Sequence, residues 1–355
     1  MNGETGPTSR HAVSRRQLLK LAGATALAAP VYLRPAWAQN KQVVVVNFGG
    51  DMGNIKQEVF YNAFTRDTGI EVVTVAGPEV AKLKLMVEQG AVEWDLIDLL
   101  PGWLGQAKKL GLLEEIDDTI VERADALPEA RDAYACGASI YAGGIAYPTD
   151  RLEGLQPKTW PEFWDVENHP GRRGLRTRIA DTLEIALMAD GVAPRDVYPC
   201  DIERAFQALD RIKPHVSHWI DSTAQTVSLI QSNETDYTFT YTTRVKGMQE
   251  AGVPMDYSFR QNLLGMLYTS VPKGAKNRDA AMQLLNYIMK PDLQVEMSNR
   301  SGDAPTYVSA LDKVTPEIRK WLPDTASEDN LIINGDWWAD HSEELEPRMK
   351  EWLLT

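Results

Sequence analysis

The feature that constrains this chain most is a regular alternation of strand-like and helix-like segments. Runs rich in β-branched and other apolar residues predict strands at 42–50, 70–77 and 94–100, the first of them buried. The segments between them carry apolar residues at helical spacing and end in glycine, which predicts helices at 54–69 and 78–90. This order predicts a parallel sheet joined by crossover helices, and therefore an α/β fold.

The rest of the chain predicts a second lobe that the polypeptide enters and then leaves. The glycine-bearing stretch 138–150 is extended and suits a strand that crosses between lobes, and 263–275 suits the return crossing. Helices are expected at 181–191, 201–213 and 277–302, the last interrupted by Pro291, and at the C-terminus. We predict one lobe formed by 39–146 with 270–355, and another formed by 147–269.

The N-terminal segment 1–38 has the layout of a secretory signal. Basic residues precede an apolar, alanine-rich stretch, Leu18–Leu33, and the small residues Ala36-Trp37-Ala38 suit cleavage after Ala38. The pair Arg15-Arg16 makes it similar to a twin-arginine signal. A membrane anchor is the alternative, but the apolar stretch falls short of the about 20 residues that span a bilayer. We exclude 1–38 from the fold.

Charge and composition exclude several classes of partner. The formal net charge is −13, and removal of the signal, with five basic residues and one acidic, leaves 317 residues with a charge near −17. Such an acidic protein disfavours nucleic acid and anionic lipid as partners. The five histidines show no metal-ligand spacing to a cysteine, so we expect no metal and no cofactor.

Cys136 and Cys200 are the only cysteines. Two cysteines in an exported protein suggest a disulfide, but cargo of the twin-arginine route folds in the reducing cytoplasm, so folding cannot depend on that bond. The sequence leaves open whether the two thiols pair.

Four phrases carry a resemblance to a known family. They are "WDLIDLLPGWLGQAKKLGLLEEID", "PKTWPEFWDVENHPGRRGLR", "VPKGAKNRDAAMQLLNYIMKPDLQ" and "DWWADHSEELEPRMKEWL". With the order of elements, they make the mature chain similar to the solute-binding proteins of ABC importers, in particular the polyamine and iron group. The resemblance implies a two-lobed periplasmic-binding-protein fold of type II with ligand in the interlobe cleft. It also implies a monomer in the periplasm that delivers a small solute to an importer permease in the inner membrane.

The first candidate ligand contacts follow predicted strands of the first lobe. In "NFGGDMGN", Gly50 and Asp51 come after the first strand, where loops and helix N-termini meet ligands in open α/β sheets, and we expect the next helix to start near Asn54. Trp103 follows the third strand, where its ring could stack on a ligand. An ordinary strand-to-helix turn and a core aromatic are the structural alternatives.

The strongest candidate is Arg244 in "YTTRVKG", just after a predicted strand and at the start of a helix. A guanidinium there can hold a carboxylate through two parallel hydrogen bonds. The corresponding family segment often has an aromatic residue and a glycine before the arginine; here Tyr241 takes the aromatic place and Thr243 departs from glycine. A salt bridge within the second lobe is the alternative for Arg244.

Leu267 differs from the residue that amine-binding members of the family usually have at this place, and the difference affects which ligand can bind. In relatives that bind amines, the strand entering the Pro-Lys-Gly segment usually bears an acidic residue at this place. A buried cation needs a paired carboxylate, and Leu267 offers none, unless Asp51 or Glu184 supplies it. The sequence therefore favours a carboxylate-bearing solute, with a polyamine or an amino-acid-like amine as the alternative.

Three further residues, each with a structural alternative, complete the candidate site. Thr182 and Ser222 could contact ligand or cap their helices, and Trp219 could line the cleft or belong to the core.

An enzyme is the rival class of function. The resemblance extends to thiaminase-like enzymes, which have the two-lobed architecture and a nucleophilic cysteine in the cleft. Cys136 lies near the first crossing, although no histidine or acid stands near it in sequence to lower its pKa. We expect a binding protein and no enzyme. A sensor that delivers ligand to a membrane receptor would share both the fold and the site.

Overall fold

The computed structural model describes Gly3 and residues 42–355. The predicted signal segment, with its cleavage after Ala38, lies outside the described residues. Residues 42–355 belong to one compact unit, and no helix among them combines the length and apolarity needed to cross a membrane.

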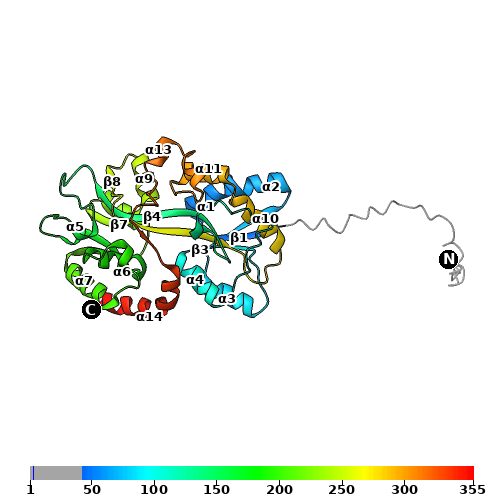
Figure 1. The fold of residues 1–355 in the computed structure, drawn as a ribbon, viewed down its shortest axis with the longest axis horizontal. Helices are drawn as coiled ribbons and strands as arrows, with labels where there is room; N and C mark the ends of the chain where they lie inside the picture. The colour runs from blue at the N-terminus through cyan, green and yellow to red at the C-terminus, as the bar shows by residue number, and fades with distance from the viewer. Residues whose placement is uncertain (1–2, 4–41) are drawn as a thin grey trace. The chain divides into compact units, whose positions relative to one another are not determined.

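The first part of the chain follows the predicted alternation (Figure 1). Its elements are β1 Gln42–Asn47, α1 Gly50–Lys56, the π-helical turn η1 Gln57–Tyr61, α2 Asn62–Thr68, β2 Glu71–Ala76, α3 Val80–Glu88, β3 Leu96–Leu99 and α4 Pro101–Lys109. The expected start of the first helix near Asn54 was wrong by one turn. Gly49 and Gly50, at φ 67° and 61°, let the backbone turn directly from strand into helix, and the Asn47 side chain accepts the N–H of Gly49.

The middle of the chain forms the second set of elements. After the short turn η2 Pro128–Ala130 these are β4 Cys136–Pro148, α5 Trp160–Trp164, β5 Arg173–Arg176, α6 Ile179–Ala189, η3 Pro194–Asp196, α7 Ile202–Ile212, η4 Lys213–His215, β6 Val216–Ile220, α8 Gln225–Gln231, β7 Tyr237–Tyr241, α9 Thr242–Glu250, β8 Met255–Tyr257 and β9 Leu263–Ser270. The strand before Arg244 and the helix that starts at it are confirmed as β7 and α9.

The C-terminal part is mostly helical. It comprises α10 Arg278–Ile288, α11 Pro291–Ser301, α12 Val308–Leu311, α13 Pro316–Arg319, β10 Leu331–Ile332 and α14 Gly335–Leu354. Pro291 opens α11, where its missing N–H costs no hydrogen bond, so the predicted helix is divided in two at that point.

All ten strands of the described part join one sheet. Its order is β2-β1-β3-β9-β4-β7-β5-β6, with β10 beside β9 and β8 beside β4. β1 pairs parallel to β2 and β3, and β5 pairs parallel to β6 and β7, whereas β4 and β9 are antiparallel neighbours between the two parallel groups. The predicted crossing segments are these two central strands, which run through the middle of the body in Figure 1.

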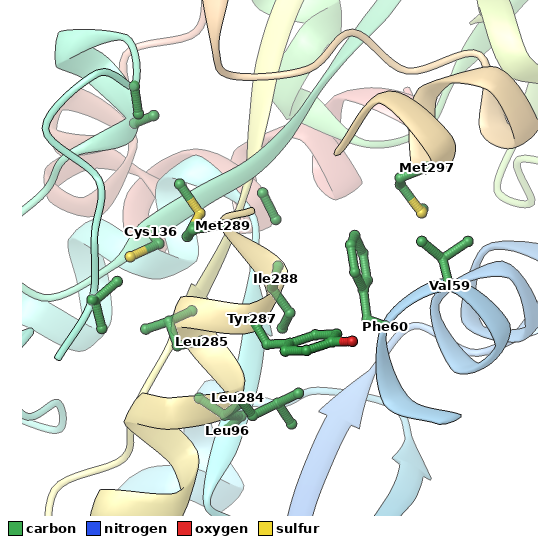
Figure 2. Packing of buried hydrophobic residues seen from close by; sticks show 14 of the residues in the cluster. Val59, Phe60, Leu96, Cys136, Leu284, Leu285, Tyr287, Ile288, Met289 and Met297 are labelled. Atoms are coloured by element: carbon green, nitrogen blue, oxygen red, sulfur yellow. The ribbon is translucent and has the colours of Figure 1, made fainter. Parts of the chain in front are cut away.

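The buried apolar residues gather on both sides of the central strands. One cluster combines residues of β1, α2, α10 and α11, and Figure 2 shows Phe60, Leu284 and Met297 converging in it. Another combines β5, α6 and α7 with the C-terminal helix, to which Trp337, Trp338 and Met349 belong. The lobe boundaries proposed from sequence stay a prediction, but α14 does not pack on the first group of elements alone.

Candidate functional site

The two crossing strands set the geometry of the junction between the two groups of elements. Tyr141 of β4 lies opposite Gly265 of β9, and Ser139 lies opposite Leu267. Directly opposed residues of neighbouring strands point to the same face of a sheet, so these four share a face. A Cβ on Gly265 would come within 2.1 Å of the Tyr141 ring, which shows that this ring lies across the glycine.

Arg178 reaches the same junction from the end of β5. One of its terminal nitrogens donates 2.9 Å to the Tyr241 hydroxyl and forms an ion pair with Asp181. The Tyr241 ring meets the Tyr141 ring edge-on, with centroids 5.6 Å apart. Burial opposes the charge of Arg178, but the Asp181 carboxylate outweighs it, and the pKa of the guanidinium stays well above its ordinary value. The side chain remains 36% exposed, yet its buried Nε has no hydrogen-bond partner in the described part of the chain.

The backbone of Asp181 is strained. Its backbone has φ 73° and ψ −45°, a region that residues with a side chain rarely adopt, and it breaks the helical geometry at the start of α6. The regular part of α6 begins after it, so the buried carboxylate lies at a helix N-terminus, where the helix dipole favours negative charge. Strained residues of this kind concentrate at functional sites.

Asp303 completes the junction from the segment after α11. The neighbouring Ala304 forms a bridge with Ile140, which brings this segment alongside β4, and the Ser139 hydroxyl is 3.4 Å from the Asp303 carboxylate. Asp303 is only 4% exposed. Burial raises the pKa of its carboxyl to about 7, against the opposing influence of Ser139 and of the Lys56 charge.

We name these residues the junction cluster: Ser139, Tyr141, Arg178, Asp181, Tyr241 and Asp303. Burial first, and then Tyr241, Asp181 and Asp303, raise the pKa of the Tyr141 hydroxyl, although the charge of Arg178 acts against this. The cluster therefore holds one guanidinium, two carboxyl groups and two neutral phenols at the meeting point of the two halves. Such an arrangement can bind both a carboxylate and an amine by hydrogen bonds to charged groups.

Of the residues predicted from sequence, Tyr241 belongs to this cluster and Leu267 borders it. Leu267 is 7% exposed and lies beside Ser139, so an apolar side chain stands where an acid was considered. Thr243 and Arg244 lie in the first turn of α9, as predicted. The methyl group of Thr243 faces Gly302 at the end of α11, and Arg244 is exposed, without an ion pair in the described part of the chain.

The candidates in the first half lie at the carboxyl ends of β1 and β3. Gly50 and Asp51 are exposed at the start of α1, beside a small hollow of about 240 Å³ that Asn47, Gly50 and Asn54 help to line. The ring of Trp103 stacks on Phe48, with centroids 5.8 Å apart and an angle of 27° between the planes. The two rings form an aromatic pair between neighbouring strand ends, and 42% of Phe48 is exposed.

Of the three remaining candidates, Trp219 packs against an apolar cluster, as its structural alternative expects, whereas the side chains of Thr182 and Ser222 do not cap α6 and α8. The buried Thr182 hydroxyl donates to the Arg176 carbonyl, and Trp219 meets Trp352 of α14 edge-on at 5.3 Å. Ser222 is exposed and accepts the N–H of Ala224. Glu184, considered as a counter-ion, instead accepts hydrogen bonds from Tyr198 and Trp338.

Sequence reasoning missed most of the junction cluster. Arg178 and Asp181 follow a strand, as Arg244 does, and the spacing "RIAD" between a strand and an apolar helix was the available signal. Ser139, Tyr141 and Asp303 carry no local signal, because pairing across β4 brings them together over 164 residues of chain.

The cysteines do not support the enzyme alternative. Both thiols are free and buried, Cys136 and Cys200 belong to different apolar clusters, and Figure 2 shows Cys136 beside Met289. Burial raises the pKa of the Cys136 thiol to about 12, although Arg123 acts against this. A nucleophile needs an accessible thiolate, and Cys136 offers neither access nor charge.

A separate cavity of about 470 Å³ lies on the opposite face of the crossing strands. It is lined mainly by apolar side chains, among them Ile140, Leu264, Met266 and Ile332. Ile140 and Met266 are opposed to each other and alternate with Tyr141 and Leu267, so they point away from the junction cluster. Few charged groups line it, and a small ionised solute would lose hydration there without replacement.

Fold and junction together define a two-lobed binding protein, and comparison with known proteins agrees. Residues 60–323 match the model of the bacterial extracellular solute-binding protein family, and the chain belongs to that family. It is therefore a solute-binding component of an ABC transporter with the two-lobed periplasmic-binding-protein fold, in which the cleft lies between the lobes.

Particular relatives span nearly the whole chain. The γ-aminobutyric acid-binding protein of Pseudomonas aeruginosa is 30% identical over 96% of this chain and 97% of its own. The solved structure of the GABA receptor Atu4243 is 31% identical and superposes with a TM-score of 0.82 over 88% of this chain and 97% of its own. The spermidine/putrescine-binding periplasmic protein of Escherichia coli is more distant, at 21% identity over 78% and 82% of the two chains.

Proposed function

We propose that this protein is exported, works as a monomer outside the cytoplasmic membrane, and captures a small carboxylate-bearing solute for an ABC importer permease. The junction cluster lies in the cleft between the lobes, and closure of the lobes over the solute presents the loaded form to the permease. β4 and β9 carry the hinge, because they are the long strands shared by the two halves.

The observation that carries this proposal is the state of Arg178. Its guanidinium is fixed by Asp181 and Tyr241 and partly exposed to solvent, and its Nε has no hydrogen-bond partner among the described residues. A guanidinium held in place binds a carboxylate through parallel hydrogen bonds without ordering a long side chain at the moment of binding. Two relatives at about 30% identity are a γ-aminobutyric acid-binding protein and a GABA receptor, which agrees with a solute that carries a carboxylate.

Binding is tested on the mature protein by thermal shift and calorimetry with γ-aminobutyrate, butyrate and putrescine. At a hundred times its dissociation constant a ligand stabilises the folded state by about 2.7 kcal/mol, which gives a clear shift in Tm. We expect the carboxylates to bind and putrescine to bind weakly or not at all.

Arg178→Lys is the first variant, because it keeps a positive charge beside Asp181 but loses the planar fork. We expect at least about a tenfold loss of carboxylate affinity with little change in the Tm of the free protein. Arg244→Lys is the matched control on the neighbouring helix. Tight putrescine binding that both variants leave unchanged would contradict the proposal.

A further inference from the structure

Asp303 is a buried carboxyl group that forms no ion pair with any residue that the structure describes. It is 4% exposed, and its side chain has one hydrogen bond in the described part of the chain, the 3.4 Å contact from Ser139. Burying a carboxylate is costly unless a positive charge or several donors compensate it. The surroundings of Asp303 supply neither.

The nearest cation is committed elsewhere. Lys56 is buried, and its Nζ lies 2.5 Å from one oxygen of Asp98, whose other oxygen accepts the hydroxyl of Thr269 at 2.8 Å. Lys56 therefore has a complete partner of its own. Lys246, whose stem packs against Gly302, is bound to Glu250 at 2.8 Å.

The guanidinium of the junction cluster, on Arg178, is also paired with a carboxylate other than Asp303. Tyr141 stands on the same strand as Ser139, and across the junction Arg178 is paired with Asp181. The guanidinium and the Asp303 carboxyl both act on Tyr141 but form no ion pair with each other. Within the junction cluster, the guanidinium of Arg178 and the carboxyl group of Asp303 are therefore not paired with each other.

Building on the proposed function, we propose that Asp303 is a specificity-determining residue that binds the ammonium group of a solute whose carboxylate is held by Arg178. The solute class is then a zwitterion with its two charges on separate ends of a short chain. Ser139 positions the Asp303 carboxyl, and the apolar side chain of Leu267, opposite Ser139, suits the methylene part of such a solute.

The raised pKa of Asp303 adds a measurable consequence. At pH 6 the free protein holds this carboxyl largely protonated, since its pKa is about 7. An ammonium group lowers the pKa of an adjacent carboxyl, so binding of the zwitterion releases a proton. Butyrate, which carries no ammonium group, releases none from Asp303.

The test measures the binding of γ-aminobutyrate, butyrate and putrescine, which share a four-carbon chain, to wild type and to Asp303→Asn. Binding is followed by calorimetry in two buffers of different ionisation enthalpy, which reveals proton release. For wild type we expect γ-aminobutyrate to bind more tightly than butyrate and to release protons near pH 6. Asp303→Asn should lose about 10- to 100-fold in affinity for γ-aminobutyrate, lose the proton release, and keep its affinity for butyrate. Ser139→Ala serves as a milder companion, because it removes only the positioning hydroxyl.

The outcomes separate this inference from the proposed function. Two results would overturn the role of Asp303 and leave the proposed function standing, provided that binding depends on Arg178. In the first, wild type binds γ-aminobutyrate and butyrate equally tightly. In the second, Asp303→Asn weakens the binding of γ-aminobutyrate and of butyrate to the same extent. Wild type that binds none of the three compounds overturns both. Should Asp303→Asn fold poorly, the buffer dependence of the wild-type enthalpy still decides, because an absent proton release contradicts the inference.

Discussion

The indole Nε1 of Trp338 donates a 2.6 Å hydrogen bond to the carboxylate of Glu184, which ties the C-terminal helix α14 to α6. Tyr198 donates to the same oxygen at 2.5 Å, and the second oxygen of Glu184 is buried and has no partner within residues 42–355. The opposite side of Trp338 lies against α4, since a Cβ on Gly102 would be 3.0 Å from the Trp338 Cβ. One tryptophan thus connects helices from both groups of elements.

The first prediction concerns the pH dependence that this contact imposes. Burial first, and then Asp181, raise the pKa of Glu184 to about 7, so the folded state binds a proton that the unfolded chain loses near its ordinary value of 4.5. The contribution to stability is present in full below pH 4.5 and is lost as pH rises through 7. Glu184→Gln keeps an acceptor for Trp338 and Tyr198 without the charge.

We therefore expect Glu184→Gln to gain stability relative to wild type, by about 1.4 kcal/mol per pKa unit, as pH rises from 5 to 8. Urea unfolding at several pH values measures this difference. Asp303 titrates in the same range, so the comparison is repeated in the Asp303→Asn background. A stability difference that is independent of pH in both backgrounds would show that Glu184 keeps its ordinary pKa.

The second prediction concerns the close packing of α14 on α4. A Cβ on Gly105 would stand 2.7 Å from the Gly335 carbonyl oxygen and 2.8 Å from the Ala339 Cβ. Gly105→Ala should cost about 1–3 kcal/mol, because one of the helices must move. Gly247→Ala in α9 is the control: its Cβ meets nothing within 4 Å, and helix propensity favours it by about 0.5–1 kcal/mol. Equal unfolding free energies for the two variants would contradict the packing.

The third prediction concerns the cysteines. Both thiols are free and buried, so we expect the native protein to react slowly with a thiol reagent and the denatured, unreduced protein to titrate two thiols. Burial keeps the pKa of Cys136 near 12, which leaves almost no thiolate at neutral pH. Fewer than two thiols in the denatured, unreduced protein would reveal a disulfide.

The fourth prediction separates Arg244 from Arg178 as the carboxylate anchor. Arg244 is exposed, whereas Arg178 is fixed among Asp181 and Tyr241, so Arg244→Ala should change ligand affinity by less than about 1 kcal/mol. Titration calorimetry with the best ligand provides the measurement. A loss of about 2–5 kcal/mol, as for an orphaned member of a buried charge pair, would restore Arg244 as the anchor.

Leu267→Asp is the companion in the crossing strand and gives the fifth prediction. It places a further carboxylate opposite Ser139, which should weaken binding of a simple carboxylate such as butyrate and favour a ligand with more positive charge, such as putrescine. Leu267→Asn, of the same shape but neutral, is the control. If both variants change the ligand preference equally, polarity and not charge is responsible.

The sequence by itself determined the class of fold and much of the order of its elements. Apolar runs between 42 and 100 that alternate with segments of helical periodicity predict a parallel α/β unit, because successive strands joined by crossover helices lie parallel. The extended stretches 138–150 and 263–275 were correctly predicted as the crossing strands. Arg244 was identified as a site candidate because a strand end followed directly by a helix start is a local pattern, and Tyr241 because the family segment often has an aromatic residue at its place.

Only the tertiary structure decided which side chains share the junction. Ser139 and Asp303 are 164 residues apart, and a pairing between Ile140 and Ala304 brings them together. The C-terminal helix likewise packs against α4 and α6 at once, although sequence assigned it to one lobe. Local pattern reports the periodicity of a segment, whereas register across strands and the packing of helices depend on residues distant in the chain. The sequence lacks a carboxyl group at Leu267, and Asp303 brings one to the junction from the segment that borders β4.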